Sequence, residues 1–192
     1  MAMRNVGQLK SMIDDLLEVT RSDTVRLKVD CRALAIGDLL AEVTAGYLRT
    51  ATDRGIALTL ECGNLPLVLG DPERLHEILA NLIENALKFT PDGGQIIVEA
   101  VSQGSYVCVT VRDTGCGLLP QHEDRIFEQF FQVDGEGEAS RSGLGLGLYI
   151  CRDLIERQGG AIWAVGTPGS GTAVSFTVPI RYTRRRGDRQ EA

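Results

Sequence analysis

The residues best suited to chemistry lie along one predicted helix near the middle of the chain. Asn81, Asn85 and Lys88 are spaced four and three residues apart, which places their side chains on one helix face. An amide oxygen can ligate Mg²⁺ and an ammonium group can pair with a phosphate. This face therefore suits a polyanion bound together with a metal ion. Taken alone, the same spacing also fits an ordinary polar face exposed to solvent.

Two glycine-containing segments add possible ligand contacts. The turn Asp113–Gly117 follows a predicted strand directly, and its aspartate can accept a hydrogen bond from an exocyclic amine such as adenine N6. Glycines there let the backbone approach a flat ring, although a plain turn is the alternative. Gly143, Gly145 and Gly147 open a predicted helix, where free N–H groups can hold phosphates. Neither a P-loop nor a dinucleotide fingerprint is present, because no Gly-Lys-Ser/Thr follows, no strand precedes, and position 148 is Leu.

The elements that must position these residues indicate an α+β protein. We expect helices at residues 36–52, 71–89 and 143–158, the second of them opened by Asp71 as N-cap and Pro72 as first helical residue. We expect extended segments at residues 26–29, 56–61, 67–69, 95–101, 106–112, 161–165 and 172–180. This order predicts a two-layer α/β sandwich, a mixed sheet with helices on one face. Residues 134–143 are polar and glycine-rich, which indicates a mobile loop.

The two ends of the chain differ from the middle. Residues 3–21 form a further predicted helix with an apolar stripe. This helix fits one of the two helices of a helical hairpin, the other being absent from this chain. The alternative is a helix packed on its own domain. From residue 181 onward, the chain has five arginines, Asp188 and Glu191, which give this tail a net charge of +3. Since the whole chain has a net charge of −6, residues 1–180 carry −9. This tail is interpreted as a solvated terminus, with a nucleic-acid or membrane arm as the alternative.

Composition narrows the class of protein. A chain of 192 residues, 43% of them hydrophobic, suffices for one packed domain with an appendage. The acidic balance argues against a nucleic-acid partner. No apolar run is long enough for a membrane span and the N-terminus lacks the apolar region of a signal peptide. Five widely spaced cysteines favour reduced, mostly buried thiols in a cytoplasmic protein, whose parent can still be membrane-anchored.

Four segments, taken in order, resemble the N, G1, F and G2 boxes of sensor histidine kinases. They are Asn81–Pro91, Asp113–Leu118, Phe127–Phe131 and Gly143–Leu148. The last hairpin, with Gln158–Trp163 and Gly169–Phe176, is also similar to that family, so the resemblance covers about residues 5–180. It implies the ATP-binding domain of the gyrase, chaperone, histidine kinase and MutL superfamily, an α+β sandwich with a mobile ATP lid.

The resemblance implies ATP and Mg²⁺ as cofactors and a role for each box. Asn85 would ligate the Mg²⁺, Asp113 would read adenine N6, and residues 128–143 would form the lid. Phe127 and Phe130 would dock that lid on the body of the domain. The other nucleotide-binding residues would be Asn81, Lys88, Phe89, Gly115, Gly117, Leu118, Phe130, Gly143, Leu144, Gly145, Leu146, Gly147, Leu148 and Thr172.

Position 81 bears on the type of reaction. Hydrolases of the superfamily would carry a glutamate there to activate water, and Asn81 cannot act as a base. The resemblance therefore implies phosphoryl transfer rather than hydrolysis. Gln132 stands where many members have an arginine near the γ-phosphate, and Arg141 in the lid would substitute for it. Asn81, Lys88 and Arg141 make up the predicted catalytic set.

The phosphate acceptor of this family is a histidine on the first helix of a hairpin. Neither His76 nor His122 lies in such a context. Helix 3–21 resembles the second hairpin helix, so we expect residues 1–25 to be a remnant of the hairpin, 26–181 the catalytic domain and 182–192 a basic disordered tail. We expect γ-phosphoryl transfer to a histidine absent from this chain, without self-phosphorylation.

The expected partners are ATP or ADP, the missing acceptor helix and a response regulator. The parent would be a homodimer, and this chain a monomer or weak dimer. One alternative is an ATP-sensing module that has lost transfer. Another is an anti-sigma-factor serine kinase of the same superfamily, which would normally lack the hairpin helix and the F box.

Overall fold

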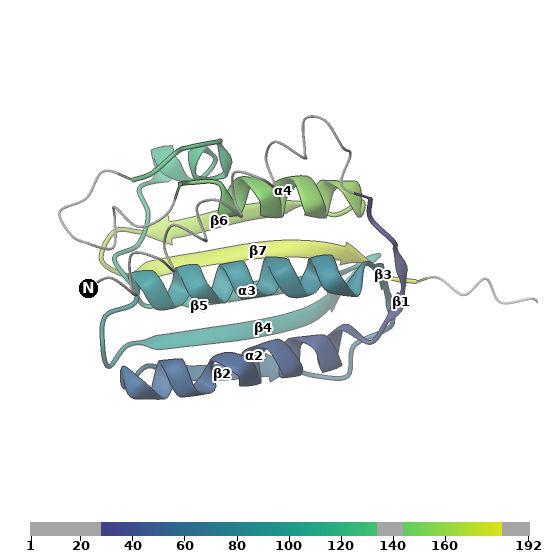
Figure 1. The fold of residues 1–192 in the computed structure, drawn as a ribbon, viewed down its shortest axis with the longest axis horizontal. Coiled ribbons are helices and arrows are strands. Elements are labelled where there is room, and N and C mark those ends of the chain that lie inside the picture. Colours follow the sequence, from purple (N-terminus) through teal and green to yellow (C-terminus); the bar gives the residue numbers. More distant parts are fainter. Residues whose placement is uncertain (1–27, 134–143, 182–192) are drawn as a thin grey trace, which may run out of the picture.

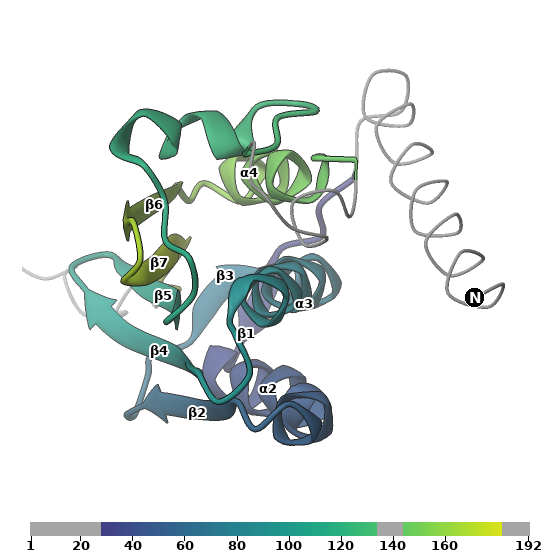
Figure 2. The same ribbon diagram turned by 90° about the vertical axis from the view of Figure 1, so that its left-hand side faces the viewer.

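The fold is a five-stranded sheet with three helices on one face (Figures 1 and 2). The computed structural model describes residues 28–133 and 144–181. The strands are β2 (Ala57–Cys62), β4 (Gln95–Gln103), β5 (Tyr106–Asp113), β6 (Ile162–Thr167) and β7 (Gly171–Pro179), and the helices are α2 (Ile36–Asp53), α3 (Pro72–Phe89) and α4 (Gly147–Arg157). The strand order is β2-β4-β5-β7-β6, with β2 parallel to β4 and every other pair antiparallel. The predicted mixed α+β sandwich is confirmed.

A second, two-stranded sheet closes one end of the domain. It pairs β1 (Arg32–Leu34) antiparallel with β3 (Val68–Gly70), and Val68 also bridges to Ile180. Of the extended segment expected at residues 26–29, residues 28 and 29 form no strand and residues 26 and 27 lie outside the described part of the chain; the strand found is Arg32–Leu34. The strand lies where a tertiary partner, β3, can supply the backbone hydrogen bonds.

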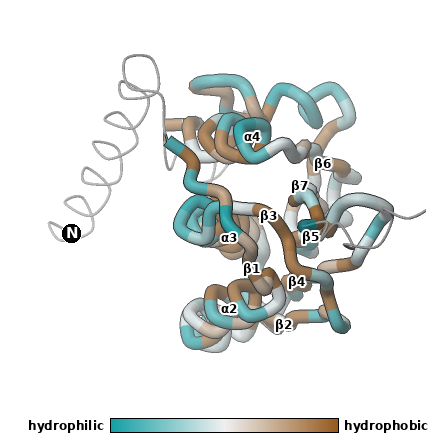
Figure 3. The backbone as a smooth tube through the Cα atoms, turned by 90° about the vertical axis from the view of Figure 1, so that its right-hand side faces the viewer, coloured by the Kyte–Doolittle hydropathy of each residue, from teal (hydrophilic) through white to brown (hydrophobic). Residues whose placement is uncertain are grey.

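Helix α3 begins and ends where its capping residues predict. The Asp71 carboxylate accepts hydrogen bonds from the N–H groups of Glu73 and Arg74, and Pro72 occupies the first helical position. At the other end, the N–H and the hydroxyl of Thr90 both donate to the Ala86 carbonyl. One side of the helix is buried against the sheet, while its hydrophilic residues lie on the side away from the sheet (Figure 3). The buried residues are Leu75, Ile78, Leu79, Leu82, Ile83, Ala86 and Leu87.

Helix α4 starts later than predicted. It begins at Gly147, with Leu146 as N-cap, and not at residue 143. Gly145 has a φ of 71°, which no right-handed helix accommodates, and its carbonyl accepts the N–H of Phe130 at 3.1 Å. Residues 144–146 therefore form a loop that leads into the helix. The helix ends at Arg157 with Gln158 as C-cap.

The thiols differ from the expectation of mostly buried cysteines. All five are free, but only Cys108 and Cys151 are buried. Cys62 is exposed at the end of β2, and Cys116 is exposed in the turn after β5. Cys62 is the last residue of β2 and Cys116 lies three residues beyond β5, so neither lies in the interior of a strand where alternation would turn its side chain into the core.

Several predicted features lie outside the described residues. They are the helix at residues 3–21, the loop at residues 134–143 and the tail at residues 182–192. Within residues 28–133 and 144–181, no helix combines the length and the hydropathy that crossing a membrane requires.

Candidate functional site

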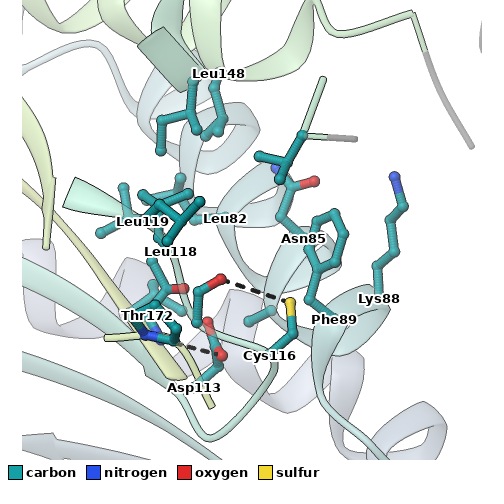
Figure 4. A pocket seen from close by; sticks show the side chains of 17 residues that line it. Leu82, Asn85, Lys88, Phe89, Asp113, Cys116, Leu118, Leu119, Leu148 and Thr172 are labelled. Atoms are coloured by element: carbon teal, nitrogen blue, oxygen red, sulfur yellow. Dashed lines mark hydrogen bonds between the residues drawn. The ribbon is translucent and has the colours of Figure 1, made fainter. Parts of the chain in front are cut away.

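An open cavity of about 520 Å³ lies between α3 and the ends of β5 and β7 (Figure 4). Most of its wall is apolar, from Leu82, Ala86, Phe89, Val111, Leu118, Leu119, Ile126, Val133, Leu148, Pro168 and Val174. The remaining lining residues are Asn85, Lys88, Asp113, Cys116, Gly117 and Thr172. A mostly apolar slot with a few polar groups is typical of a site for a small molecule with a flat ring.

Asp113, the last residue of β5, is the buried carboxylate of this cavity. It is 8% exposed. Its Oδ1 accepts the N–H of Gly115 at 2.7 Å and the N–H of Thr172 at 3.3 Å. Burial raises the pKa of Asp113, and the two backbone hydrogen bonds oppose that rise. Both bonds use Oδ1, so Oδ2 is the oxygen available to a donor in the cavity.

Gly115 and Gly117, which follow Asp113, lie so close to neighbouring backbone atoms that a side chain at either position would overlap them. A Cβ on Gly115 would lie 2.5 Å from the carbonyl oxygen of Phe89, at the end of α3. Gly117 has a φ of 75°, and a Cβ there would overlap the carbonyl of Thr167. The turn is therefore pressed between α3 and the β6–β7 turn, so the glycines hold the cavity floor in place.

A Gly117→Ala variant is expected to lower the free energy of unfolding by more than about 1 kcal/mol, because alanine fits neither the positive φ nor the space. Urea denaturation followed by circular dichroism measures the change. Gly37→Ala is the matched control, since nothing lies within 4 Å of a Cβ there and the position is helical. The control is expected to be neutral or slightly stabilising. Equal losses in both variants would contradict the argument.

The polar face of α3 divides between two surfaces. Asn85 and Lys88 line the main cavity, whereas Asn81 lines a smaller groove of about 240 Å³ between α3 and α4. Asn85 Nδ2 donates to Asn81 Oδ1 at 2.9 Å. The Asn81 amide also packs against Gly147, where an added Cβ would overlap it. Asn81 therefore supports Asn85 and the start of α4 from behind and does not face the cavity.

Lys88 lies at the mouth of the cavity with Phe89. Its ammonium nitrogen is 4.8 Å from the centre of the Phe89 ring, a cation–π distance. Lys88 is half-buried, and this burial lowers its pKa. A ligand anion beside the ammonium would counter that effect and favour the charged form.

The leucines of the glycine-rich segment serve different surfaces. Leu146 is fully buried in the core and Leu144, partly buried, packs against that core, so these two side chains anchor the segment. Leu148, in the first turn of α4, lines the cavity. Gly145 packs against the backbone of Phe130 and Phe131. The remaining predicted members, Gly143 and Arg141, lie outside the described residues.

The two phenylalanines expected to dock the lid behave differently. Phe127 is 1% exposed and the guanidinium of Arg152 lies 4.5 Å from its ring centre, so its ring belongs to the core of the domain. Phe130 is 58% exposed, has a φ of 63° and does not line the cavity. Its docking and binding roles stay predictions, because residues 134–143 of the lid lie outside the described residues. Its N–H is bonded to Gly145, which turns the side chain outward. The neighbouring Phe131 is partly buried, and its ring contacts His122 and Arg125.

Sequence reasoning missed most of the apolar wall. Val111 and Asp113 share one face of β5, and Val174 and Thr172 share one face of β7, because side chains two apart in a strand point the same way. This alternation could have identified both valines once the two polar residues were chosen. Leu119, Ile126 and Pro168 come from turns and short helical segments, and no periodicity marks them.

Residues 70–182 match the family model described as histidine kinase-, DNA gyrase B-, and HSP90-like ATPase. The chain belongs to this ATPase family. It is 33% identical over 192 residues to the sensor histidine kinase RcsC of Escherichia coli K12, a match that covers 97% of this chain and 20% of RcsC. It is 31% identical over 172 residues to the sensor protein SrrB of Staphylococcus aureus MRSA252, which covers 90% of this chain and 30% of SrrB.

Solved structures agree with this assignment to the ATPase family. Full-length ShkA in complex with AMPPNP superposes with a TM-score of 0.82 at 32% identity, covering 96% of this chain and 39% of ShkA. The catalytic domain of histidine kinase ThkA superposes with a TM-score of 0.68 at 27% identity, covering 79% of this chain and 96% of that domain. This member of the ATPase family is therefore an ATP-binding catalytic domain of the sensor histidine kinase type. It spans 20–30% of the length of the curated relatives RcsC and SrrB.

Proposed function

We propose that this domain binds Mg·ATP in the main cavity and positions the γ-phosphoryl group for transfer to a histidine outside the catalytic domain. One observation carries the proposal. The buried Asp113 carboxylate places one oxygen at the floor of an apolar slot whose mouth holds Asn85 and Lys88. This arrangement suits a ligand with an amine on a flat ring at one end and phosphates at the other.

The base end of the ligand would lie on the sheet. Asp113 Oδ2 would accept a hydrogen bond from adenine N6, while Val111, Leu118 and Val174 would enclose the ring. Specificity comes from the buried carboxylate, because a ring without that donor would leave it unpaired.

The phosphate end would lie between the two helices. Lys88 at the end of α3 would pair with a phosphate oxygen, and the first N–H groups of α4, from Gly147 onward, would donate to others. Positioning and charge neutralisation are what phosphoryl transfer asks of the protein.

The residues present fit a magnesium ion held mainly by the nucleotide. Asn85 Nδ2 is engaged by Asn81, which leaves Asn85 Oδ1 as an oxygen ligand facing the cavity. No cluster of three His, Cys, Asp or Glu side chains occurs within residues 28–133 and 144–181. One amide oxygen, phosphate oxygens and water are a common ligand set for Mg²⁺, which supplies neutralisation of the phosphate charge.

Hydrolysis by this chain is expected to be slow. Asn81 cannot accept a proton from water, and Glu84 accepts the Tyr47 hydroxyl at 2.7 Å outside the main cavity. A missing general base costs about 10² to 10⁴ in rate. Phosphate release from Mg·ATP should therefore be 10² to 10⁴ times slower than in hydrolases of the superfamily. Turnover at the rate of a gyrase would contradict this expectation.

The proposal is tested by calorimetric titration with Mg·AMPPNP, followed by transfer from γ-labelled ATP to a hairpin peptide that carries an acceptor histidine. Acid-labile label on the peptide supports the proposal. Binding without transfer would support an ATP-sensing module instead. Acid-stable label on a serine would support a serine kinase.

Arg141 is proposed to assist transfer from the lid. In the same transfer assay, Arg141→Ala is expected to slow the reaction by 10³-fold or more, as loss of a transition-state arginine does in other phosphoryl transfers. Gln132→Ala is the matched comparison, since its neutral amide cannot neutralise charge and should matter little. Unchanged transfer in the Arg141 variant would remove this residue from the mechanism.

The rest of the kinase is also part of the proposal. Residues 26–181 would be the catalytic domain, preceded by a hairpin helix at residues 1–25 and followed by a basic tail at residues 182–192. A homodimeric parent would present the acceptor helix to this domain, and a response regulator would take the phosphoryl group from the histidine. The sensor-protein relatives support this placement.

A further inference from the structure

A buried polar junction lies at the ends of α3 and α4 that are far from the cavity. Asp71, the N-cap of α3, is 7% exposed, and Gln158, the C-cap of α4, is 6% exposed. The N–H of Asp71 donates to Gln158 Oε1 at 2.8 Å. Gln158 Nε2 donates to the Leu154 carbonyl at 3.0 Å. These two hydrogen bonds tie the start of α3 to the last turn of α4.

The Asp71 carboxylate makes one more bond than a helix cap requires. Its Oδ1 alone accepts both capping N–H groups, at 3.0 and 3.2 Å. Its Oδ2 accepts the N–H of Asp30 at 2.8 Å, from the segment just before β1. That segment runs past the same ends of α4 and α3 (Figure 1). One carboxylate therefore holds the incoming chain and α3 together.

The junction is closely packed. A Cβ on Gly70, the residue before Asp71, would lie 3.3 Å from Gln158 Oε1 and 2.6 Å from Leu75 Cδ1. Since no space is left between these groups, a displacement of one must move the others.

We infer that Asp71 and Gln158 are positioning residues for the triphosphate end of the nucleotide site and that Asp71 connects this end to the chain preceding the domain. The inference rests on the proposed function. Asn85 and Lys88 lie on α3, and the proposed phosphate donors lie at the start of α4. The position of α3 relative to α4 therefore sets the distance between the two sides of the phosphate site. The adenine floor, Asp113 and Thr172, lies on the sheet.

Two substitutions of the full chain test this inference. Asp71→Asn keeps an oxygen for the capping bonds but replaces the acceptor of the Asp30 N–H with a donor. Gln158→Met keeps the side-chain length but removes both of its hydrogen bonds. Affinities for Mg·AMPPNP and for adenosine are measured by calorimetry. We expect each variant to weaken AMPPNP about tenfold, as supporting residues around a site commonly do, and to change adenosine less than twofold.

Ser175→Ala is the control for loss of a buried polar contact. Ser175 is buried on β7 and its hydroxyl pairs with Thr110 at 2.9 Å. We expect the control to leave the ratio of the two affinities unchanged. Proportional losses of both ligands in the junction variants would indicate general destabilisation and overturn the inference. Junction variants that bind both AMPPNP and adenosine as tightly as the unaltered chain does would also overturn the inference. Absence of AMPPNP binding by the unaltered chain would overturn the proposed function itself.

The connection to Asp30 has its own test. Asp30→Pro removes the N–H donor without altering Asp71, and Asp30→Ala keeps that donor. We expect Asp30→Pro to reproduce the AMPPNP loss of Asp71→Asn and the double variant to add nothing further, because both changes break one bond. The alanine variant should bind as the unaltered chain does. Additive losses, or no loss in the proline variant, would overturn the connection.

Discussion

Replacement of Asp113 by asparagine is expected to weaken ATP binding by about 100-fold or more while the domain stays folded. Asparagine Oδ1 can keep both backbone hydrogen bonds, from Gly115 and Thr172. Its Nδ2 would meet the N6 amine of adenine donor to donor, which leaves two buried groups unsatisfied at about 1–3 kcal/mol each. Calorimetric titration with Mg·AMPPNP measures the loss.

The same variant separates binding from stability. The folded-state pKa of Asp113 is raised above its ordinary value of 3.8, so the folded protein binds more protons than the unfolded chain between 3.8 and the raised pKa. The contribution of Asp113 to stability therefore falls as pH rises through that window. Asparagine does not ionise, so the variant does not lose stability in this way as pH rises. The unfolding free energy of the variant minus that of the unaltered protein should increase between pH 4 and pH 7 in urea titrations.

Asp38→Asn is the control for the change of charge. Asp38 is exposed on α2, away from the cavity lining. The control should bind AMPPNP normally. Normal AMPPNP affinity in the Asp113 variant would remove this residue from base recognition.

Replacement of Asn85 by alanine should abolish the response of nucleotide binding to Mg²⁺ and slow phosphoryl transfer by about 10² to 10³. Its amide oxygen is the one protein ligand proposed for the ion, and loss of one such stabilising contact has effects of this size in other enzymes. Affinity for ATP is measured with Mg²⁺ and with a chelator. The unaltered chain should differ between the two conditions and the variant should not. A retained Mg²⁺ response would place the metal ligand elsewhere.

Asn81→Ala is the informative companion variant. Asn81 lies outside the main cavity and holds the Asn85 amide through one hydrogen bond. Its loss frees Asn85 to rotate without removing the oxygen. The Mg²⁺ response should therefore weaken but persist. Equal effects in both variants would mean that Asn81 contacts the ligand directly.

The parts of the fold governed by local chemistry could be predicted from the sequence. The bounds of α3 follow from the Asp71 cap, Pro72 and the Thr90-Pro91 stop, all of which act within one helical turn. The polar residues of the site were also predictable, because Asn85, Lys88, Asp113 and Thr172 do gather at one cavity.

What could not be predicted depends on contacts between distant segments. The start of α4 is set by Gly145, whose carbonyl is bonded to Phe130. The same bond fixes the backbone of Phe130, whose side chain is exposed. The position of β1 is likewise set by its pairing with β3. None of these partners is a neighbour in sequence, and periodicity carries no information about them.

The place of β7 in the sheet has a consequence for biosynthesis. This strand is the last of the domain along the chain, yet it lies between β5 and β6. Until the ribosome has released it, β5 has an unpaired edge and the wall of the cavity lacks Thr172 and Val174. Nascent chains that end before β7 therefore present an open strand edge, which favours association with chaperones or aggregation. Nucleotide cannot assist folding before translation has passed this strand.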